Sequence, residues 1–334
     1  MKLKKKRIVI VASIFLVGVI AFVFYYVSSI YKGLDGLSKT ADNSPFYEVK
    51  ANDEKIVEPP KWTGKEPVNI LLMGVDARGT SKGEIPRSDS MMVVTLDPVR
   101  DRIHVFSILR DTYTEIPEHG KNRINTAITY GPNTAMSAIS DLLGIPIQFY
   151  VYTDFQGFIK LVDAVGGVDF YVEKNMNYES KADKHEYDID LKEGQQHLDG
   201  TTALQYVRFR HDAMSDYSRT KRQREFTNAI VEKMKSTTSI MKLPSILEEV
   251  SPYIDTNLSV NDMWKLASVG YRSKMEASEQ IPPMNLVKET YVGRAAVLGV
   301  SSSNELKEYV RNIIENDASE QSEEGKQNVE EAIK

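Results

Sequence analysis

The sequence predicts a layered α/β/α domain with a central mixed sheet, preceded by one membrane-spanning helix. Short apolar runs that are typical of buried strands alternate along the chain with amphipathic segments that are typical of helices. The N-terminus instead carries a basic cluster followed by a long uncharged stretch. Of the 334 residues, 41% are hydrophobic and 27% are charged, a composition that indicates a globular protein with enough chain for a full core.

The membrane span is expected at residues 8–27, directly after the basic segment 1–7. About 20 apolar residues in a helix span roughly 30 Å, the thickness of a bilayer core. Basic residues beside a span stay in the cytoplasm, so we expect a single-pass type II protein of the cell membrane with everything after residue 30 outside the cell. The alternative is a cleaved signal peptide, whose apolar region is normally shorter and ends at an A-x-A-like site that is not evident here.

The rest of the chain divides by composition into three parts. Residues 28–66 are polar and weakly periodic, and Pro59 and Pro60 interrupt them, so we expect an extracellular stem. Residues 67–315 hold the predicted catalytic domain, and the acidic segment 316–334 is expected to be disordered. The chain has no cysteine, which excludes disulfides, thiolate metal sites and a cysteine nucleophile.

The elements of the domain follow from periodicity and from turn signals. Strands are predicted over residues 67–75, 90–96, 102–109, 145–153 and 168–172. Helices are predicted over residues 133–144, 154–167, 199–207 and 215–234, with Gly144 as a C-cap and Asp154 as an N-cap. Residues 173–197 indicate an irregular surface excursion, and residues 240–315 are predicted to be mostly helical.

The segment 206–226 gathers six Lys or Arg side chains against three acids, although the net charge of the chain is −5. Arg219, Arg222 and Gln223 continue the helical stripe of the apolar residue Phe226 towards the helix start. Cations there oppose the helix dipole, whereas a bound phosphate would benefit from both the dipole and the arginines. The pattern therefore favours an anionic, diphosphate-bearing ligand, and a solvated basic helix face is the alternative.

The short sequence "RFR" adds two arginines next to this helix. If it is extended, Arg208 and Arg210 project from the same face, because the side-chain period of a strand is two. Two adjacent guanidiniums repel one another unless an anion lies between them. We therefore expect both side chains to contact the same anion.

Asp and Arg residues recur at the ends of the predicted strands, where α/β sheets usually bind ligands. They are Asp76, Arg78, Arg87, Asp89 and Arg110. Mg²⁺ is typically held by one or two carboxylates together with substrate phosphates, so a metal-bridged pyrophosphate fits these residues. Ordinary surface pairing of Asp with Arg is the alternative for any single pair.

Other catalytic schemes find little support in the sequence. The five histidines lack metal-ligand spacing, and His211 is of interest only because it adjoins Arg210. No G-x-S-x-G, Walker A or strand-linked G-x-G-x-x-G motif is present. A role in binding nucleic acid conflicts with the predicted topology and with the net negative charge.

Taken in order, these segments make the chain resemble the LytR–CpsA–Psr family of Gram-positive cell-wall transferases. Two departures are visible: Leu109 stands where the family often has Pro, and residues 130–132 read "YGP" where a Gly pair is common. Neither removes a charged group. The matching motifs are "GVDAR" (74–78), "RSDSM" (87–91), "SILRD" (107–111), "RIN" (123–125), "VDAVGGV" (162–168), "LDGTTALQYVRFR" (198–210) and "DYSRTKRQ" (216–223).

The resemblance implies an enzyme that moves a glycopolymer, usually teichoic acid, from a polyprenyl diphosphate carrier to peptidoglycan. It implies that Asp76 and Asp89 hold Mg²⁺, or Mn²⁺ in its place, and that these two and Arg110 are catalytic. The diphosphate would be bound by Arg87, Arg110, Arg208, Arg210 and Gln223. Supporting roles would fall to Arg78, Asp216, Arg219 and Arg222.

In the implied reaction a muramic acid hydroxyl attacks the sugar-linked phosphorus, and polyprenyl phosphate leaves. The resemblance also implies an apolar tunnel for the lipid, for which residues 155–162 and 91–96 are potential linings. Two other functions share these features. One is an envelope regulator that binds polyprenyl diphosphate without catalysis, and the other is a hydrolase that uses water as the acceptor.

Overall fold

The structure is a computed structural model that describes residues 2–37, 44–46, 60–78, 80, 84–179, 188–211 and 216–315. A six-stranded sheet with the strand order β11-β6-β1-β2-β3-β12 forms its centre. These strands are β1 (Val68–Val75), β2 (Ser88–Asp97), β3 (Arg102–Ile108), β6 (Phe149–Asp154), β11 (Ile254–Thr256) and β12 (Lys274–Ile281). Parallel pairs (β1 with β6, β3 with β12) and antiparallel pairs both occur, which confirms the predicted mixed sheet.

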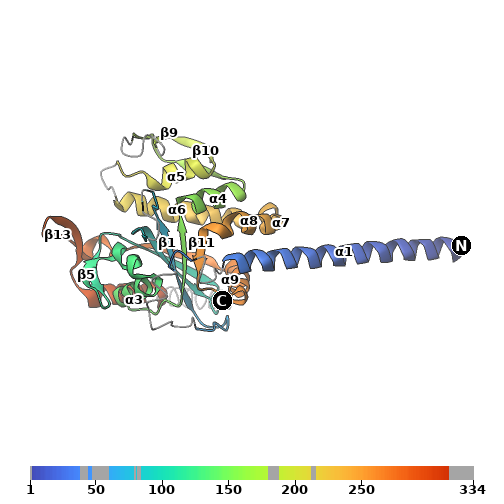
Figure 1. Cartoon of the computed structure of the whole chain (residues 1–334), viewed down its shortest axis with the longest axis horizontal. Coiled ribbons are helices and arrows are strands. Elements are labelled where there is room, and N and C mark those ends of the chain that lie inside the picture. The colour runs from blue at the N-terminus through green and yellow to red at the C-terminus, as the bar shows by residue number, and fades with distance from the viewer. Residues whose placement is uncertain are drawn as a thin grey trace, which may run out of the picture.

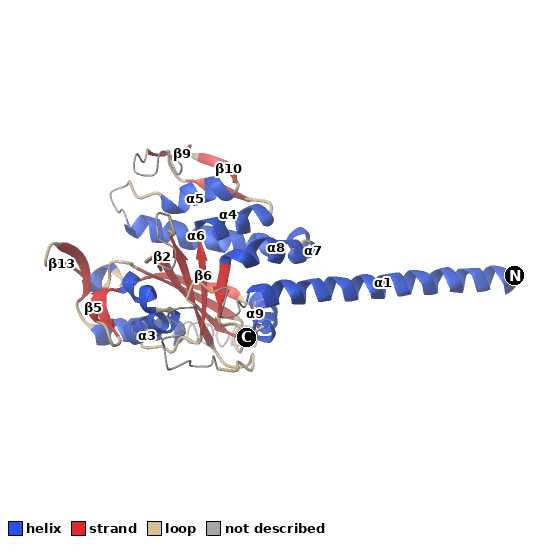
Figure 2. Cartoon of the chain, in the orientation of Figure 1, coloured by secondary structure: helices blue, strands red, loops and turns tan. Residues whose placement is uncertain are grey.

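Helices cover both faces of this sheet (Figure 1). One face carries α4 (Phe155–Ala164), α5 (Gly200–Arg208), α6 (Asp216–Met234) and α8 (Leu243–Val250), and the opposite face carries α3 (Pro132–Leu143). A last helix spans residues 303–315. Figure 2 shows the strands running between these two helical layers. The remaining helices are α1 (Lys2–Leu37), α7 (Thr237–Met241), α9 (Val260–Arg272) and the 3₁₀ turns η2 (Ile124–Tyr130), η3 (Ser251–Tyr253) and η4 (Met284–Leu286).

Local sequence signals set the helix ends as predicted. The side chain of Asp154 accepts a hydrogen bond from the backbone N–H of Gly157 at the start of α4. Gly144 ends α3 in the left-handed conformation, at φ 73°, where a residue with a Cβ would be strained. These caps fix the directions in which α3 and α4 leave the sheet.

Two regions differ from the sequence-based prediction. The segment 173–197 was expected to be irregular, but it contains β8 (Met176–Tyr178), β9 (Ile189–Leu191) and most of β10 (Gly194–Leu198). Residues 240–315 were expected to be mostly helical, yet they supply β11, β12, β13 (Val287–Val292) and β14 (Ala295–Val300). The reason is that these strands are short or lie at edges, so partners in space rather than a continuous apolar run define them.

The other small sheets pair neighbouring segments. β7 (Val168–Val172) pairs with β10, β8 with β9, and β13 with β14. β4 (Tyr113–Ile116) pairs with β5 (Gly120–Arg123) directly after the predicted site residue Arg110. The hairpin β13–β14 and the hairpin β4–β5 lie side by side, because Thr112 forms a bridge with Leu298.

The N-terminal segment forms the long helix α1, which extends away from the domain (Figure 1). Within the described part of the chain, no helix combines the length and the apolar character needed to cross a membrane. The C-terminal end of α1 packs on the domain, where Ile30 is buried. Within the predicted stem, Phe46 is also fully buried and makes edge contacts with the rings of Tyr150 and Tyr152. The described parts of this stem therefore belong to the folded body.

We expect Phe46→Ala to lower the free energy of unfolding by about 3–5 kcal/mol, because it leaves a cavity beside Tyr150 and Tyr152. Denaturant unfolding of the full chain in detergent measures this change. The matched control is Tyr291→Ala at an exposed position of β13, which should stay within about 0.5 kcal/mol of the parent. Equal stability of the two variants would show that Phe46 does not anchor the segment.

Candidate functional site

Asp76 and Asp89 stand where β1 ends and β2 begins. In the antiparallel register Gly74 pairs with Ser90 and Val75 pairs with Ser88, so Asp89 is the extra residue of a β-bulge. A bulge re-aims the side chain of the residue it adds. Asp76 follows the last residue of β1, and both carboxylates line the same cavity. The two acids that the sequence proposed as metal ligands thus line one cavity, and each is paired with an arginine, Asp76 with Arg78 and Asp89 with Arg110.

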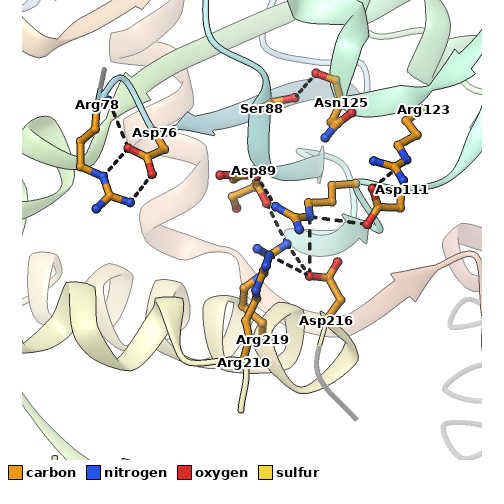
Figure 3. A network of polar contacts seen from close by, with 12 residues as sticks. Asp76, Arg78, Ser88, Asp89, Asp111, Arg123, Asn125, Arg210, Asp216 and Arg219 are labelled. Carbon is orange, nitrogen blue, oxygen red and sulfur yellow. Dashed lines mark hydrogen bonds and ion pairs between the residues drawn. The ribbon is translucent and has the colours of Figure 1, made fainter. Parts of the chain in front are cut away.

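Arg110 lies two residues after the end of β3. It joins a cluster in which Asp89, Asp216 and Arg219 lie close together (Figure 3). One of its terminal nitrogens lies 2.5 Å from Oδ1 of Asp89. Its Nε lies 3.8 Å from Oδ1 of Asp216 at the start of α6. Burial alone would lower the pKa of Arg110, but the carboxylates of Asp89 and Asp216 outweigh burial and raise it. Arg110 therefore stays charged while it is half-buried.

Asp216 is a shared counter-ion. Its Oδ1 lies 2.8 Å from Arg219 and 3.8 Å from both Arg110 and Arg210. Arg219 also donates a hydrogen bond of 3.1 Å to the backbone carbonyl of Asp89. Three guanidiniums thus converge on one carboxylate oxygen, while Asp89 supplies a second negative charge to Arg110.

Arg219 is the most deeply placed member of this cluster. Burial lowers its pKa to about 10, and the neighbouring guanidiniums of Arg110 and Arg210 act in the same direction against Asp216. Its buried Nε finds no hydrogen-bond acceptor among the described residues. An anion at this point would supply both the missing acceptor and the missing negative charge.

A second ion pair, Asp111 with Arg123, adjoins Arg110. The sequence analysis did not assign these two residues to the site. Asp111 lies 3.6 Å from Nε of Arg110 and 3.2 Å from Nε of Arg123. Arg123 also donates a hydrogen bond of 2.6 Å from its guanidinium to the carbonyl of Ala296 in β14. The motifs "SILRD" and "RIN" contained both residues, but their proximity depends on the hairpin β4–β5.

The site arginines on the other side of the cavity share an aromatic surface. Arg78 forms hydrogen bonds with the carboxylate of Asp76. The guanidinium of Arg78 lies 5.5 Å from the ring centre of Phe155, and that of Arg208 lies 5.0 Å from it. Cation–π contact with one ring keeps two like charges near each other at the cavity mouth.

The expected extended "RFR" is wrong in the structure, because α5 continues to Arg208 and the chain leaves the helix at Phe209. The helix persists since Val207 and Tyr206 bury their side chains in the core. Arg208 and Arg210 nevertheless both line the cavity. The shared anion remains the expectation, although the reason given for it was incorrect.

Three other predicted residues take different positions. Gln223 lines the cavity and accepts a hydrogen bond of 3.0 Å from Ser90. Arg222 is buried away from it, where it contacts Glu173 at 3.2 Å and the carbonyl of Phe209 at 3.1 Å. Arg87 is exposed and lies outside the cavity lining that the described residues form.

The cavity has a volume of about 580 Å³, and its character changes along its length. Its charged part comprises Asp76, Arg78, Asp89, Arg110, Asp154, Arg208, Arg210 and Arg219. The apolar part lies between the sheet and helices α4, α5 and α6, and includes Met92, Phe158, Leu161, Val207 and Ile230. Both segments expected to line a lipid tunnel, 155–162 and 91–96, contribute side chains to it.

The carboxylates fit a divalent cation only in part. Asp76 and Asp89 offer hard oxygen donors at one cavity mouth, whereas no cluster of three or more acidic or histidine ligands occurs among the described residues. Mg²⁺ commonly uses one or two carboxylates and completes its shell with substrate phosphates and water. The donor set therefore fits a cation held jointly with a diphosphate.

Comparison with known proteins agrees with this geometry. The profile of the LytR_cpsA_psr family matches residues 23–309. The match spans most of the chain and contains every site residue described above. The chain belongs to the LytR_cpsA_psr family.

Relatives within this family carry more specific names. The polyisoprenyl-teichoic acid–peptidoglycan teichoic acid transferase TagU of Bacillus cereus is 35% identical over 274 residues, which cover 81% of this chain and 84% of that one. The crystal structure of TagV of Bacillus subtilis has a TM-score of 0.62 and 29% identity, over 75% of this chain and 97% of that one. YwtF (TagT) of Bacillus subtilis, with bound octaprenyl pyrophosphate lipid, has a TM-score of 0.56 and 25% identity, over 78% of this chain and 95% of that one.

We expect Asp216→Asn to lower the melting temperature of the full chain by several degrees. The change leaves three guanidiniums without their common counter-ion, at a cost of roughly 1–3 kcal/mol. Inorganic pyrophosphate should then raise the melting temperature of this variant more than that of the parent. Asp169→Asn, at an exposed carboxylate on β7, is the control and should leave both values unchanged. An Asp216 variant as stable as the parent would contradict the shared role.

Proposed function

We propose that the protein transfers a glycopolymer, of the wall teichoic acid type, from a polyprenyl diphosphate carrier to peptidoglycan. The observation that carries this proposal is the cavity, which joins an arginine-rich mouth to an apolar interior. An amphiphile with a diphosphate head and an isoprenoid chain matches both parts. Its relative TagU is named for this transfer, and TagT holds an octaprenyl pyrophosphate lipid.

In the proposed reaction the chain's own residues bind and orient the diphosphate. Arg110, Arg210 and Arg219 contact its oxygens, and Arg208 and Gln223 border them. The muramic acid hydroxyl oxygen attacks the phosphorus that bears the sugar. A new P–O bond forms to the acceptor, the bond to polyprenyl phosphate breaks, and a mouth carboxylate, Asp89 or Asp76, accepts the hydroxyl proton.

Positive charge at the mouth is the main source of catalysis in this proposal. The arginines are already held in place by Asp216, Asp89 and Asp111, so they stabilise charge on the leaving diphosphate oxygens without further reorganisation. Mg²⁺, or Mn²⁺, held by Asp76 and Asp89 with substrate oxygens would add neutralising charge there. The apolar interior holds the lipid and excludes water from the reacting bond.

We also propose that α1 anchors the protein in the cell membrane, with the catalytic domain on the outer side. The support comes from the sequence, in which the basic segment 1–7 precedes the uncharged run 8–27, and from the helical structure of that run. The lipid carrier and the peptidoglycan acceptor are both found at that membrane face. This topology gives the enzyme access to both substrates.

Hydrolysis of the carrier is the second candidate function, because water could take the place of the muramic acid hydroxyl. A transfer assay separates the candidates. The full chain is incubated in liposomes with a polyprenyl-diphosphate disaccharide, peptidoglycan oligomers and Mg²⁺. Product on the muramic acid supports transfer, cleavage without attachment supports hydrolysis, and tight binding without either product supports a regulator.

We expect Arg110→Ala to lower the turnover number by about 10²–10³-fold, because it removes a preorganised charge from the leaving diphosphate. Arg110→Lys should restore only part of the loss, since Lys lacks the planar fork that binds two oxygens at once. The initial rate of transfer measures both variants. The exposed Arg272→Ala is the control. A parental turnover number for Arg110→Ala would contradict the assignment.

We expect a chelator to abolish transfer and added Mg²⁺ to restore it. Asp89→Asn should lower activity by at least 10²-fold and weaken the dependence on Mg²⁺, because a neutral amide is a poorer ligand than a carboxylate. Asp169→Asn serves as the distant control. Transfer at the full rate in excess chelator would exclude a required divalent cation while leaving the arginine cluster as the catalytic group.

A further inference from the structure

The elements beside α1 point to a second surface that contacts lipid. Helices α7 and α8 run alongside the C-terminal end of α1. Tyr26 donates a hydrogen bond to the carbonyl of Ile240, and Gly33 lies against Leu247. Further along, Gly36 approaches Ser251. The offset in sequence is constant to within one residue, so the two segments are parallel and in register.

The contact at Gly33 is close. A Cβ built on this residue would lie 2.6 Å from Cβ of Leu247, a separation that real side chains do not tolerate. The two helix backbones therefore approach closely because residue 33 is a glycine. This contact and the burial of Ile30 hold α1 in a defined position against the domain.

Helix α7 lies at the end of this pair that faces the apolar part of α1. Ile240 is 40% exposed and Met241 is 70% exposed, and the neighbouring Lys242 is also exposed. The adjacent turns of α1 expose a continuous apolar surface made of Val19, Ile20, Phe22, Val23, Phe24, Tyr25 and Val27. Apolar side chains with a flanking cation are the pattern of an element that lies in a membrane interface.

The acidic residues of α8 lie towards its far end. Glu248 and Glu249 are exposed on α8, seven and eight residues after Met241. At the helical rise they lie roughly 10 Å further from the apolar part of α1. The charge order along α7–α8, with Lys first and Glu later, therefore complements an anionic lipid surface at the α7 end.

We propose that α7 is a membrane-docking element whose side chains Ile240 and Met241 insert into the headgroup region of the outer leaflet, with Lys242 on anionic headgroups. This rests on the proposed anchoring of α1. The same elements border the apolar interior of the cavity, because Met234 and Val250 line it and stand just before α7 and at the end of α8. Docking thus brings the apolar part of the cavity next to the bilayer that supplies the lipid.

Single-cysteine labelling tests the proposal directly, since the chain contains no cysteine of its own. Met241→Cys, Tyr291→Cys and Ile20→Cys are each labelled with a nitroxide in the full chain. The chain is reconstituted in vesicles of phosphatidylglycerol and phosphatidylethanolamine. The accessibility of each label to dioxygen and to a water-soluble nickel complex then reports its depth. Tyr291, 75% exposed on β13, is the matched control.

The label at Met241 should show the high oxygen and low nickel accessibility of a membrane interface, whereas the label at Tyr291 should be fully aqueous. If Ile20 is immersed and Met241 is as aqueous as Tyr291, docking by α7 is refuted and the anchor stands. If Ile20 is also aqueous, both the anchor and the docking are refuted. Neither outcome depends on whether the chain is a transferase.

A kinetic measurement gives an independent test. Met241→Asp should raise the apparent KM for a long-chain lipid substrate presented in vesicles by about tenfold, the effect of losing one buried apolar side chain. It should leave the rate on a short, water-soluble diphosphate analogue unchanged, because Met241 lies outside the cavity lining. An equal loss on both substrates, or no loss on either, would contradict membrane docking.

Discussion

The electrostatic repulsion between guanidinium groups in a partly buried space is the constraint on which the structure around the cavity depends. Arg110, Arg210 and Arg219 are close enough to repel one another, and the Oδ1 atom of Asp216 holds them together. Asp89 and Asp111 pair with Arg110, whereas Arg210 and Arg219 share the carboxylate of Asp216, so the repulsion between the guanidiniums is only partly offset. A bound anion at the cavity mouth would reduce this repulsion, which is the physical reason for the proposed binding of a diphosphate.

The rest of the fold serves to bring these groups to one place. The bulge at Asp89 turns its carboxylate towards Arg110, and α6 carries Arg219 and Gln223 over the sheet. Behind them, Asp111 and Arg123 connect the end of β3 to the hairpin β13–β14. Charged residues therefore come from four distant parts of the chain and meet where the ends of β1, β2 and β3 face α6.

Sequence reasoning predicted the features that depend on residues near one another in the chain. The strands β1, β2 and β3 follow from their apolar runs, and residues at their ends, such as Asp76, Asp89 and Arg110, could be proposed as a site because strand ends converge. The role of Asp111 could not be predicted, because it depends on a contact made by a hairpin. The helical conformation of Arg208 in "RFR" could not be predicted either, because it depends on the burial of the last turn of α5. β12 was missed because its alternating polar residues become a strand only beside β3.

The close packing of Gly33 on Leu247 has a consequence for where the enzyme can work. With α1 anchored in the bilayer as proposed, a helix packed rigidly on the domain would hold the cavity mouth at a fixed distance above the outer leaflet, whereas a flexible tether would not. The glycan strands within reach of the site would then be those that pass at that distance from the membrane.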